Sequence, residues 1–424
     1  MEVSVRRSDL TGRTAAPPSK SFTHRGLLCA ALAEGRSRVI SPLVSDDTEA
    51  TAEVLSGLGV GVTRSSGVWE VEGGVLQRPE EALHCRESGT TLRMTTALSA
   101  LVDGVCTLTG AASLTGRPVG PLVDGLNQLG ADCTSNGGFP PVVVRGRGRL
   151  RGGAAEMPGD VSSQFISAIL LVAPRTDEGV TLKLTTPLES RPYVRMTMEA
   201  QRSFNVDVQT AGDMSEFTVE GQSYEPSDFE VEGDWSSASY LLAGGALAGS
   251  VELTGLKDES SQADAAMAEA LRMMGADVSV QYTSIAAERS KLNGITFEVS
   301  DCPDLFPILS ALCATAEGDS VIRGIRRLRL KESDRVAAVA EGLARMGVET
   351  IGEENSFIIH GSTPHGGVID PHGDHRIAMA FGILGLAAEG ETTILDAECV
   401  SKSFPGFWGA LEDLGAELRW GYNE

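Results

Sequence analysis

The chain has 424 residues, of which 42% are hydrophobic and 22% are charged, a length and composition typical of a folded protein with two domains. Its 35 Lys and Arg residues against 58 Asp and Glu residues give a net charge of −23, which argues against nucleic acid or an anionic membrane as a partner. No apolar run approaches the roughly 20 residues of a membrane-spanning helix. The seven cysteines are scattered and form no Cys-x-x-Cys pair, so we expect reduced thiols in a cytoplasmic protein.

Six similar segments follow one another along the chain. In each, an apolar helix ends at a Gly or Asn, and a short strand follows. These marker residues are 71, 75, 70, 72 and 68 residues apart: Gly59, Gly130, Asn205, Gly275, Gly347 and Gly415. The spacing predicts six repeats of about 71 residues.

Each repeat contains the same succession of elements. A buried helix is followed by a turn, a strand, a loop, a second helix, a Gly turn, another strand and a hairpin. In the first repeat the apolar stretch GLLCAALA leads through Glu34-Gly35 into the strand SRVI. This alternation predicts a mixed α/β fold with helices packed beside sheets. A solenoid is the generic alternative, but solenoid repeats usually have about 20–50 residues.

The first unusual motif is PPSKSFTHR, which places Lys20, Ser21, His24 and Arg25 in one helical turn after a proline stop. The N-terminus of a helix carries a partial positive charge, so cations there are repelled unless an external anion compensates. We interpret this turn as an anion clamp. A solvated basic turn is the alternative.

Two motifs in the second half of the chain combine carboxylates with cations. CPDLFP sets Asp304 in an apolar run, which indicates either an N-cap or a general base with a raised pKa. LKESDR places the like charges Lys331 and Arg335 four residues apart, with Glu332 between them. We interpret this motif as a second anion site, with an ordinary ion pair to Asp334 as the alternative.

Two further motifs place cations at helix starts. DPHGDHR contains His372 and His375, but no Cys or third His lies near, so we predict no metal site and interpret Arg376 as an anion contact. SKSFPGF places Lys402 before a helix start that contains a proline. Gly-rich nucleotide-binding loops are absent from the sequence. Together the motifs indicate small, highly anionic ligands bound among helix N-termini.

In their order along the chain, these motifs resemble the 5-enolpyruvylshikimate-3-phosphate (EPSP) synthase family. The matching segments cover essentially the whole chain: PSKSFTHR, ESGTTLR, TGRPVGPLVDGL, SSQF, RPYV, LKESDR, DHRIAMA and SKSFPGF. The resemblance implies a two-domain enolpyruvyl-transferase clamp, an inside-out α/β barrel with three repeats in each domain. It places chain crossings near Arg13 and Asp228, so that residues 1–13 and 229–424 form one discontinuous domain, residues 14–228 form the other, and the active site lies in the cleft between them.

The resemblance also implies an enzyme of the shikimate pathway. The family transfers the enolpyruvyl (carboxyvinyl) group of phosphoenolpyruvate to the 5-hydroxyl of shikimate 3-phosphate and releases phosphate, by addition and elimination through a tetrahedral intermediate. It requires neither a metal nor an organic cofactor. The expected partners are therefore these two small molecules, and we expect a cytoplasmic monomer.

The family motifs assign roles to individual residues. The residues implied for shikimate 3-phosphate are Lys20, Ser21, Arg25, Ser162, Ser163, Gln164, Ser190, Tyr193, Asp304 and Lys331. Those implied for phosphoenolpyruvate are Lys20, Gly89, Arg117, Gln164, Arg335, Arg376 and Lys402. The implied base toward the 5-hydroxyl is Asp304 and the implied proton donor is Glu332, assisted by Lys20, His375 and Lys402. We assign no role to Glu87 and Arg327, where family members often carry Asn.

Two alternatives to this function differ at particular residues. UDP-N-acetylglucosamine enolpyruvyl transferase shares the fold and the donor, but its resemblance would require Lys-Asn at the first helix and a cysteine near Arg117. This chain has Lys20-Ser21 and no cysteine there. A non-catalytic repeat protein that binds anions would have no need for Asp304 and Glu332 beside the cations.

Overall fold

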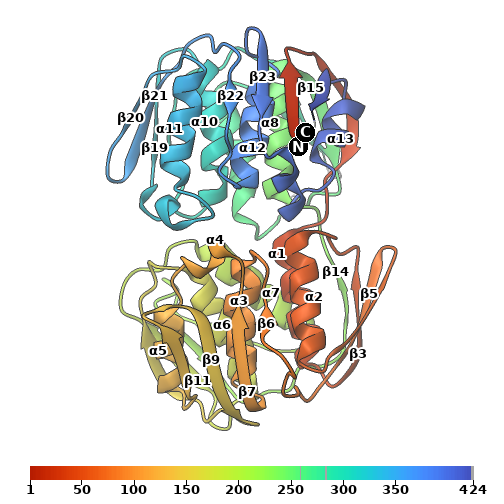
Figure 1. Ribbon diagram of the computed structural model, residues 1–424, viewed down its shortest axis with the longest axis vertical. Coiled ribbons are helices and arrows are strands. Elements are labelled where there is room, and N and C mark those ends of the chain that lie inside the picture. Colours follow the sequence, from red (N-terminus) through yellow and green to blue (C-terminus); the bar gives the residue numbers. More distant parts are fainter. Residues whose placement is uncertain (258, 282–283, 422–424) are drawn as a thin grey trace. The chain divides into compact units, whose positions relative to one another are not determined.

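The computed structural model describes residues 1–257, 259–281 and 284–421, and it divides into two compact units. Met1–Pro17 and Gly233–Glu424 form the discontinuous unit, and Pro18–Glu232 form the inserted unit (Figure 1).

Both boundaries lie later in the chain than Arg13 and Asp228, where the sequence placed them. Strand β2 (Leu10–Ala15) pairs along its whole length with β15 (Gly249–Thr254) of the discontinuous unit. Strand β14 (Asp228–Glu230) pairs with β3 (Gly35–Ile40) of the inserted unit. Because these two strands pair within their units, the chain passes from one unit to the other a few residues later than the motifs suggest.

The elements of each unit follow the repeat. Those of the inserted unit, where η denotes a 3-10 helix, are α1 (Lys20–Leu32), β3, α2 (Asp46–Gly57), β4 (Gly61–Ser65), β5 (Val68–Gly73), β6 (Leu83–His84), α3 (Gly89–Ser99), β7 (Asp103–Thr109), α4 (Ala112–Thr115), α5 (Gly120–Gln128), β8 (Cys133–Asn136), β9 (Phe139–Arg147), β10 (Gly153–Met157), α6 (Ser163–Val172), η1 (Ala173–Arg175), β11 (Val180–Leu184), α7 (Arg191–Ser203), β12 (Gln209–Thr210), β13 (Glu216–Val219) and β14.

The elements of the discontinuous unit are β1 (Glu2–Arg6), β2, α8 (Trp235–Ala248), β15, η2 (Ala263–Ala265), α9 (Ala266–Met273), β16 (Asp277–Gln281), β17 (Ser284–Glu288), β18 (Thr296–Glu298), η3 (Pro303–Leu305), α10 (Phe306–Thr315), β19 (Asp319–Arg323), η4 (Arg326–Leu330), α11 (Arg335–Arg345), β20 (Thr350–Gly352), β21 (Ser356–His360), β22 (Val368–Ile369), α12 (His375–Gly385), β23 (Glu391–Ile394), η5 (Ala397–Lys402), α13 (Phe407–Asp413) and β24 (Leu418–Gly421).

The described strands form six four-stranded sheets, three in each unit, and all six have the same pattern of one parallel and two antiparallel strand pairs. In the sheet β6-β7-β9-β8, the first two strands are parallel and the other two neighbouring pairs are antiparallel. Every marker residue at a helix end has a positive φ, including Asn205 at 60°, as left-handed C-terminal residues do. The prediction of six α/β repeats is therefore confirmed.

Distant segments complete the first and last sheets. β14 joins β3, β5 and β4 in the inserted unit, and β1 lies between β23 and β24 in the discontinuous unit. In each unit, one sheet thus receives a strand from a distant part of the chain. This strand completes the fourth position of that sheet, so each unit contains three complete repeats.

Three central helices in each unit are almost wholly buried: α1, α3 and α6, and α8, α10 and α12. Helices that are buried on all sides are expected inside a core, where α1 and α3 also carry polar residues such as Arg25 and Arg93. Figure 1 shows α8, α10 and α12 side by side, and likewise α3 and α6. None of the helices in the described residues has the length and apolarity needed to cross a bilayer.

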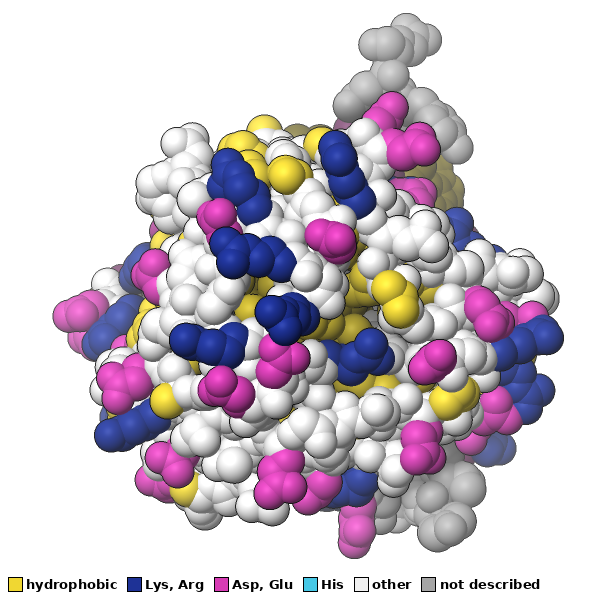
Figure 2. Space-filling view, turned by 90° about the horizontal axis from the view of Figure 1, so that it is seen from below, with side chains coloured by type: hydrophobic (Ala, Val, Ile, Leu, Met, Phe, Trp, Pro, Cys, Tyr) yellow, Lys and Arg dark blue, Asp and Glu magenta, His cyan; other side chains and the backbone are white. Residues whose placement is uncertain are grey.

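On the face of the inserted unit that Figure 2 shows, the acidic residues do not form a continuous acidic surface. Figure 2 views this unit from the foot of Figure 1, and Lys and Arg side chains are interspersed with Asp and Glu side chains there. Surface pairs of this unit include Arg36 with Glu70 and Arg145 with Asp132. Part of the charge is therefore balanced locally.

Candidate active site

Arg335 is the centre of the charged cluster in the discontinuous unit. It begins α11, and its side chain is only 1% exposed. Its guanidinium donates to three carboxylates, at 2.8 Å each: Nε to Asp374, Nη1 to Asp304 and Nη2 to Glu332. Because three segments of the chain meet on one buried guanidinium, Arg335 fixes the relative positions of these carboxylates.

Asp304 accepts from two arginines and lies near a lysine. Arg376 Nη2 is 2.9 Å from Asp304 Oδ2, and Lys331 Nζ is 3.9 Å from Asp304 Oδ1. Burial raises the pKa of the Asp304 carboxyl, but the charges of Arg376, Lys331 and Arg335 outweigh it and hold the pKa well below its usual range. The raised pKa expected from the apolar sequence around Asp304 is therefore wrong, because the sequence does not show these cations nearby.

The other predicted residues of this unit lie at neighbouring helix ends. Arg376 donates from Nη1 to Ser236 Oγ at 2.5 Å, which links the starts of α12 and α8. His375 is buried, with Nδ1 3.9 Å from Asp374 Oδ1, and Lys402 is buried at the end of η5. His372, the other histidine of this motif, is partly exposed and contacts Glu341. The DPHGDHR motif thus supplies one buried and one exposed histidine.

Lys20, the first residue of α1 in the inserted unit, is fixed by an ion pair. Its Nζ lies 2.9 Å from Asp47 Oδ2 on α2, and both side chains are largely buried. Sequence analysis missed Asp47, because an Asp at a helix start is normally an N-cap. Ser45 caps this helix instead, together with Thr48. The first turn of α2 contains two consecutive acidic residues, Asp46 and Asp47, and this pair was the feature of the sequence that could have indicated a second role.

His24 is not part of the predicted anion clamp. Its ring is buried, and Nδ1 lies 2.7 Å from Thr51 Oγ1. Burial lowers the pKa of His24 to about 3, so the ring is neutral at physiological pH. A neutral ring in the core cannot hold an anion as a cation would.

Arg25 links α1 to α7. Its guanidinium donates to Thr197 Oγ1 and to the backbone oxygens of Ser21 and Tyr193, at 2.8–2.9 Å. Burial lowers the pKa of Arg25 to about 10, so it remains protonated near neutral pH. These bonds use three of the five N–H groups of the guanidinium, and they bring Ser21 and Tyr193 to one place. Ser190, also buried, precedes α7 in a left-handed conformation.

Gln164 is positioned by α3. Its Oε1 accepts from Arg93 Nη1 at 2.7 Å, and its Nε2 donates to Thr90 Oγ1 at 2.9 Å. Ser162 caps α6 by accepting from the Gln164 backbone N–H, and Ser163 begins that helix. Arg93 is a second residue that the sequence analysis did not select, although it ends the motif ESGTTLR.

Gly89 and Arg117 are in contact. An added Cβ at Gly89 would lie 2.8 Å from Arg117 Nη1 and 2.9 Å from its Cζ, so the guanidinium lies against the glycine at the start of α3. Arg117 is mostly buried. These two predicted residues are 28 positions apart in the sequence and lie against each other in the structure.

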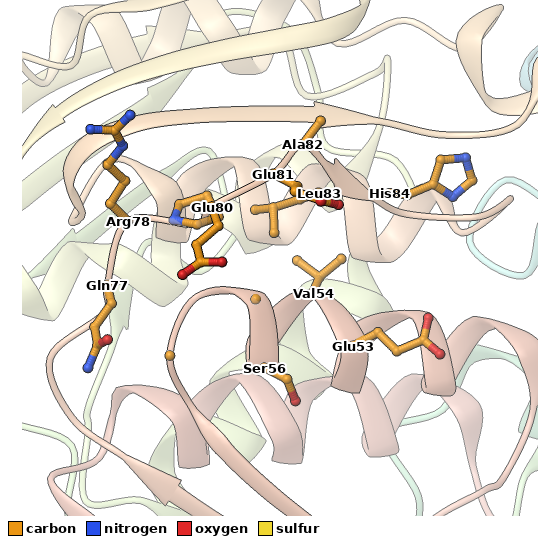
Figure 3. A pocket seen from close by; sticks show the side chains of 13 residues that line it. Glu53, Val54, Ser56, Gln77, Arg78, Glu80, Glu81, Ala82, Leu83 and His84 are labelled. Carbon is orange, nitrogen blue, oxygen red and sulfur yellow. The ribbon is translucent and has the colours of Figure 1, made fainter.

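A separate hollow of about 550 Å³ lies on the inserted unit, between the second half of α2 and the segment leading into β6 (Figure 3). Glu53, Gln77, Glu80 and His84 are among its lining residues. Because its lining includes no residue that the motifs select, we do not connect this hollow with the candidate active site.

Six repeats around buried central helices, with cations and carboxylates at helix N-termini, define the chain as an enolpyruvyl transferase. The structure of EPSP synthase from Acinetobacter baumannii is similar with a TM-score of 0.84 and 30% sequence identity, covering 99% of this chain and 100% of that one. The enolpyruvyl transferase NikO from Streptomyces tendae shares the fold, with a TM-score of 0.80, 21% identity, and coverage of 99% and 98%.

Within this class, the chain belongs to the EPSP synthase family. The family pattern described as EPSP synthase (3-phosphoshikimate 1-carboxyvinyltransferase) matches residues 5–411. The 3-phosphoshikimate 1-carboxyvinyltransferase of Dehalococcoides mccartyi is 42% identical over 420 residues, which cover 99% of both chains. That of Natronomonas pharaonis is 42% identical over 440 residues, covering 99% of this chain and 100% of the relative.

The chain is therefore a transferase of the shikimate pathway, which leads to aromatic amino acids. It moves the enolpyruvyl group of phosphoenolpyruvate to shikimate 3-phosphate. The two alternatives, UDP-N-acetylglucosamine enolpyruvyl transferase and a non-catalytic anion-binding protein, are not supported by these findings.

Proposed function

We propose that polar groups at the helix starts of the inserted unit bind most of shikimate 3-phosphate: Lys20, Ser21, Arg25, Ser162, Ser163, Gln164, Ser190 and Tyr193, with Asp304 and Lys331 from the discontinuous unit. For phosphoenolpyruvate the proposed residues are Lys20, Gly89, Arg117, Gln164, Arg335, Arg376 and Lys402. The arrangement supports anion binding at these positions, because helix N-termini and buried cations both favour phosphate and carboxylate groups.

The observation that carries the mechanism is the pairing of Asp304 with three cations. A carboxylate held in this way is a weak base, because its charged form is stabilised. Substrate phosphate and carboxylate groups that attract Lys331 and Arg376 would weaken these pairs and raise the basicity of Asp304. Substrate binding would thus prepare Asp304 to accept the proton of the 5-hydroxyl.

In the proposed sequence, Glu332 in its protonated form gives a proton to the methylene carbon of phosphoenolpyruvate. The adjacent carbon becomes electrophilic, and the 5-hydroxyl oxygen bonds to it while Asp304 takes the hydroxyl proton. Loss of phosphate breaks the carbon–oxygen bond of the tetrahedral intermediate, and removal of a methyl proton restores the double bond. Lys20, His375 and Lys402 assist by stabilising the charge that develops on phosphate and carboxylate.

The test is phosphate release from phosphoenolpyruvate, measured with and without shikimate 3-phosphate. We expect release only when both are present, and none when UDP-N-acetylglucosamine replaces the acceptor. Asp304→Asn and Glu332→Gln should each lower kcat by about 10²–10⁴-fold, the usual contribution of a general acid or base. Release without shikimate 3-phosphate, or full activity of both variants, would contradict the assignment.

Lys402→Ala provides a second test. We expect it to reduce turnover by about 10²-fold or more, the usual loss of a group that stabilises transition-state charge. Binding of shikimate 3-phosphate should remain measurable by calorimetry. Lys291→Ala, at an exposed lysine that pairs with Glu317, is the matched control and should behave as the unchanged protein.

We also propose that the protein is a cytoplasmic monomer. The seven free cysteines support a reducing compartment, because six of them are buried as thiols and none forms a disulfide among the described residues. Size-exclusion chromatography with light scattering tests the oligomeric state: a mass near 44.5 kDa is expected, and a multiple of it would refute the monomer.

A further inference from the structure

His24 begins a series of buried hydrogen bonds that the proposed mechanism does not use. Its Nδ1 lies 2.7 Å from Thr51 Oγ1, which lies 2.7 Å from Thr91 Oγ1. Thr91 Oγ1 in turn donates to Ser88 Oγ at 2.7 Å. All of these residues are at most 1% exposed. His24 is on α1, Thr51 on α2 and Thr91 on α3, so the series joins three helices of the inserted unit.

The hydrogen bonds of this series run in one direction. Thr91 is the donor toward Ser88, and a hydroxyl has one hydrogen, so Thr51 must donate to Thr91. Thr51 then has no hydrogen left for His24, and His24 Nδ1 carries the proton of that contact. The ring holds only this proton, because burial lowers the pKa of His24 to about 3. The contacts therefore require the Nδ1–H tautomer of a neutral imidazole.

The series ends at the first turn of α3, beside two residues of the candidate active site. Ser88 is the N-cap of α3 and accepts from the backbone N–H of Thr91 as well as from its hydroxyl. The next residue, Gly89, lies against the Arg117 guanidinium. Thr91 Oγ1 also contacts the backbone oxygen of Asp47 on α2, at 3.3 Å. A shift of this turn would therefore move Gly89 relative to Arg117.

We propose that His24, Thr51 and Thr91 are positioning residues whose hydrogen bonds fix the start of α3 and so place Gly89 and Arg117 for phosphoenolpyruvate. This inference rests on the proposed function, in which Gly89 and Arg117 bind that substrate. His24, Thr51 and Thr91 do not touch the reacting atoms in this proposal. They act through the position of the first turn of α3.

The first test compares Thr51→Val and Thr91→Val with the unchanged full-length protein by steady-state kinetics. Valine keeps the branched shape of threonine and removes the hydroxyl, so either change interrupts the series. Each should raise KM for phosphoenolpyruvate about tenfold, the effect of displacing a positioning group by a fraction of an ångström. KM for shikimate 3-phosphate should stay within about twofold, because neither Gly89 nor Arg117 is among its proposed contacts.

Conservative variants should preserve the function of the series. Thr51→Ser and Thr91→Ser keep the hydroxyl, and His24→Asn keeps a side-chain N–H donor, so KM for phosphoenolpyruvate should stay within about threefold of the unchanged value. His24→Leu has no donor and should behave as the valine variants do. Thr96→Val is the matched control, because this buried hydroxyl of α3 donates to the Leu92 oxygen of its own helix. It should leave both KM values unchanged.

A double variant adds a measurement that a purely structural role would not change. If Thr91 acts through the contact of Gly89 with Arg117, Thr91→Val should add little once Gly89→Ala has already displaced Arg117. KM for phosphoenolpyruvate in the double variant should then rise about tenfold, whereas independent effects would multiply to about a hundredfold. A hundredfold rise would overturn the inference.

Nitrogen NMR tests the direction of the series. At pH 7 the His24 ring, assigned by its loss in His24→Asn, should show a protonated Nδ1 and an unprotonated Nε2. A proton on Nε2 would contradict the proposed direction.

Unaltered KM for phosphoenolpyruvate in both valine variants would overturn the inference. So would an equal rise in both KM values together with a lower Tm, which would indicate general loosening. If Thr91→Val does not fold, Thr51→Val and its rescue by Thr51→Ser decide. An unchanged protein that releases no phosphate would instead contradict the proposed function, so the two failures are distinguishable.

Discussion

The chemistry of single residues in this protein is set by neighbours that lie far away in the sequence. Asp304 shows this most clearly, since its ion-pair partners Lys331, Arg335 and Arg376 follow it by 27, 31 and 72 positions. The sequence around Asp304 is apolar, and burial alone would make it a stronger base. The three cations reverse that effect. The direction of a pKa shift therefore requires the fold, even when the residue itself is found from its motif.

Lys331 gives a prediction at this scale. Burial lowers its pKa to about 8, so the ammonium loses its charge as pH rises through that value. We expect the affinity for shikimate 3-phosphate to fall about tenfold between about pH 7 and pH 9, because Lys331 loses its charge over this range. The phosphate of the substrate has a second pKa of about 6, so its own ionisation contributes little to the change. Calorimetric titrations across this range provide the measurement.

Lys331→Arg should bind independently of pH over the same range, since a guanidinium stays charged. Lys183→Arg, at an exposed position of β11, is the control and should keep the full pH dependence. If Lys331→Arg loses affinity above pH 8 as steeply as the unchanged protein, another group titrates and Lys331 is not the contact.

At the scale of elements, the sequence predicts where helices begin better than it predicts which side chains contact those helix ends. The motif ESGTTLR locates the beginning of α3, but only the structure shows that Gly89 lies against the Arg117 guanidinium. Glycine is required there by space, because its φ is not in the left-handed region.

Gly89→Ala tests this contact. The added Cβ meets the end of a flexible side chain, so Arg117 moves and the fold is little affected. We expect KM for phosphoenolpyruvate to rise about tenfold, the effect of displacing a positioning group by a fraction of an ångström, with little change in Tm. Gly409→Ala in α13, where an added Cβ meets nothing within 4 Å, is the control. An unchanged KM in Gly89→Ala would exclude Arg117 as a donor contact.

Asp47 and Arg93 show why part of the site escaped sequence analysis. Asp47 is an acidic residue near a helix start, where capping is the ordinary explanation, and Arg93 lies inside α3. In the structure Asp47 pairs with Lys20 on a neighbouring helix, and Arg93 donates to Gln164 on α6. These contacts depend on how neighbouring helices pack against each other, and that packing cannot be predicted from the residues next to Asp47 or Arg93 in the sequence.

For the molecule as a whole, the repeat was the most predictable feature. The marker glycines and Asn205 lie at equivalent helix ends because a left-handed residue is needed there in every repeat. The repeat pattern did not predict that β1 pairs with β23 or that β14 pairs with β3, since β1 and β14 are short strands without a distinctive pattern. The boundaries between the two units were therefore predicted a few residues too early in the chain.

The net charge of −23 gives a prediction for the whole molecule. Self-repulsion among excess carboxylates destabilises a compact chain, and salt screens it within a Debye length of about 10 Å at 0.1 M. Surface pairs such as Arg145 with Asp132 are weakened by the same screening, but each contributes about 1 kcal/mol or less. We therefore expect repulsion to dominate and added KCl to raise Tm by about 5 °C between low salt and 1 M.

Differential scanning calorimetry in KCl, NaCl and choline chloride at matched ionic strength tests this expectation. Screening depends on ionic strength rather than on the cation, so the three salts should raise Tm to a similar extent. A preference for K⁺ would indicate specific ion binding in place of screening. A Tm that stays constant or falls in all three salts would show that the mixed charge seen on the inserted unit already balances the repulsion, and that the acidic composition does not limit stability at low salt.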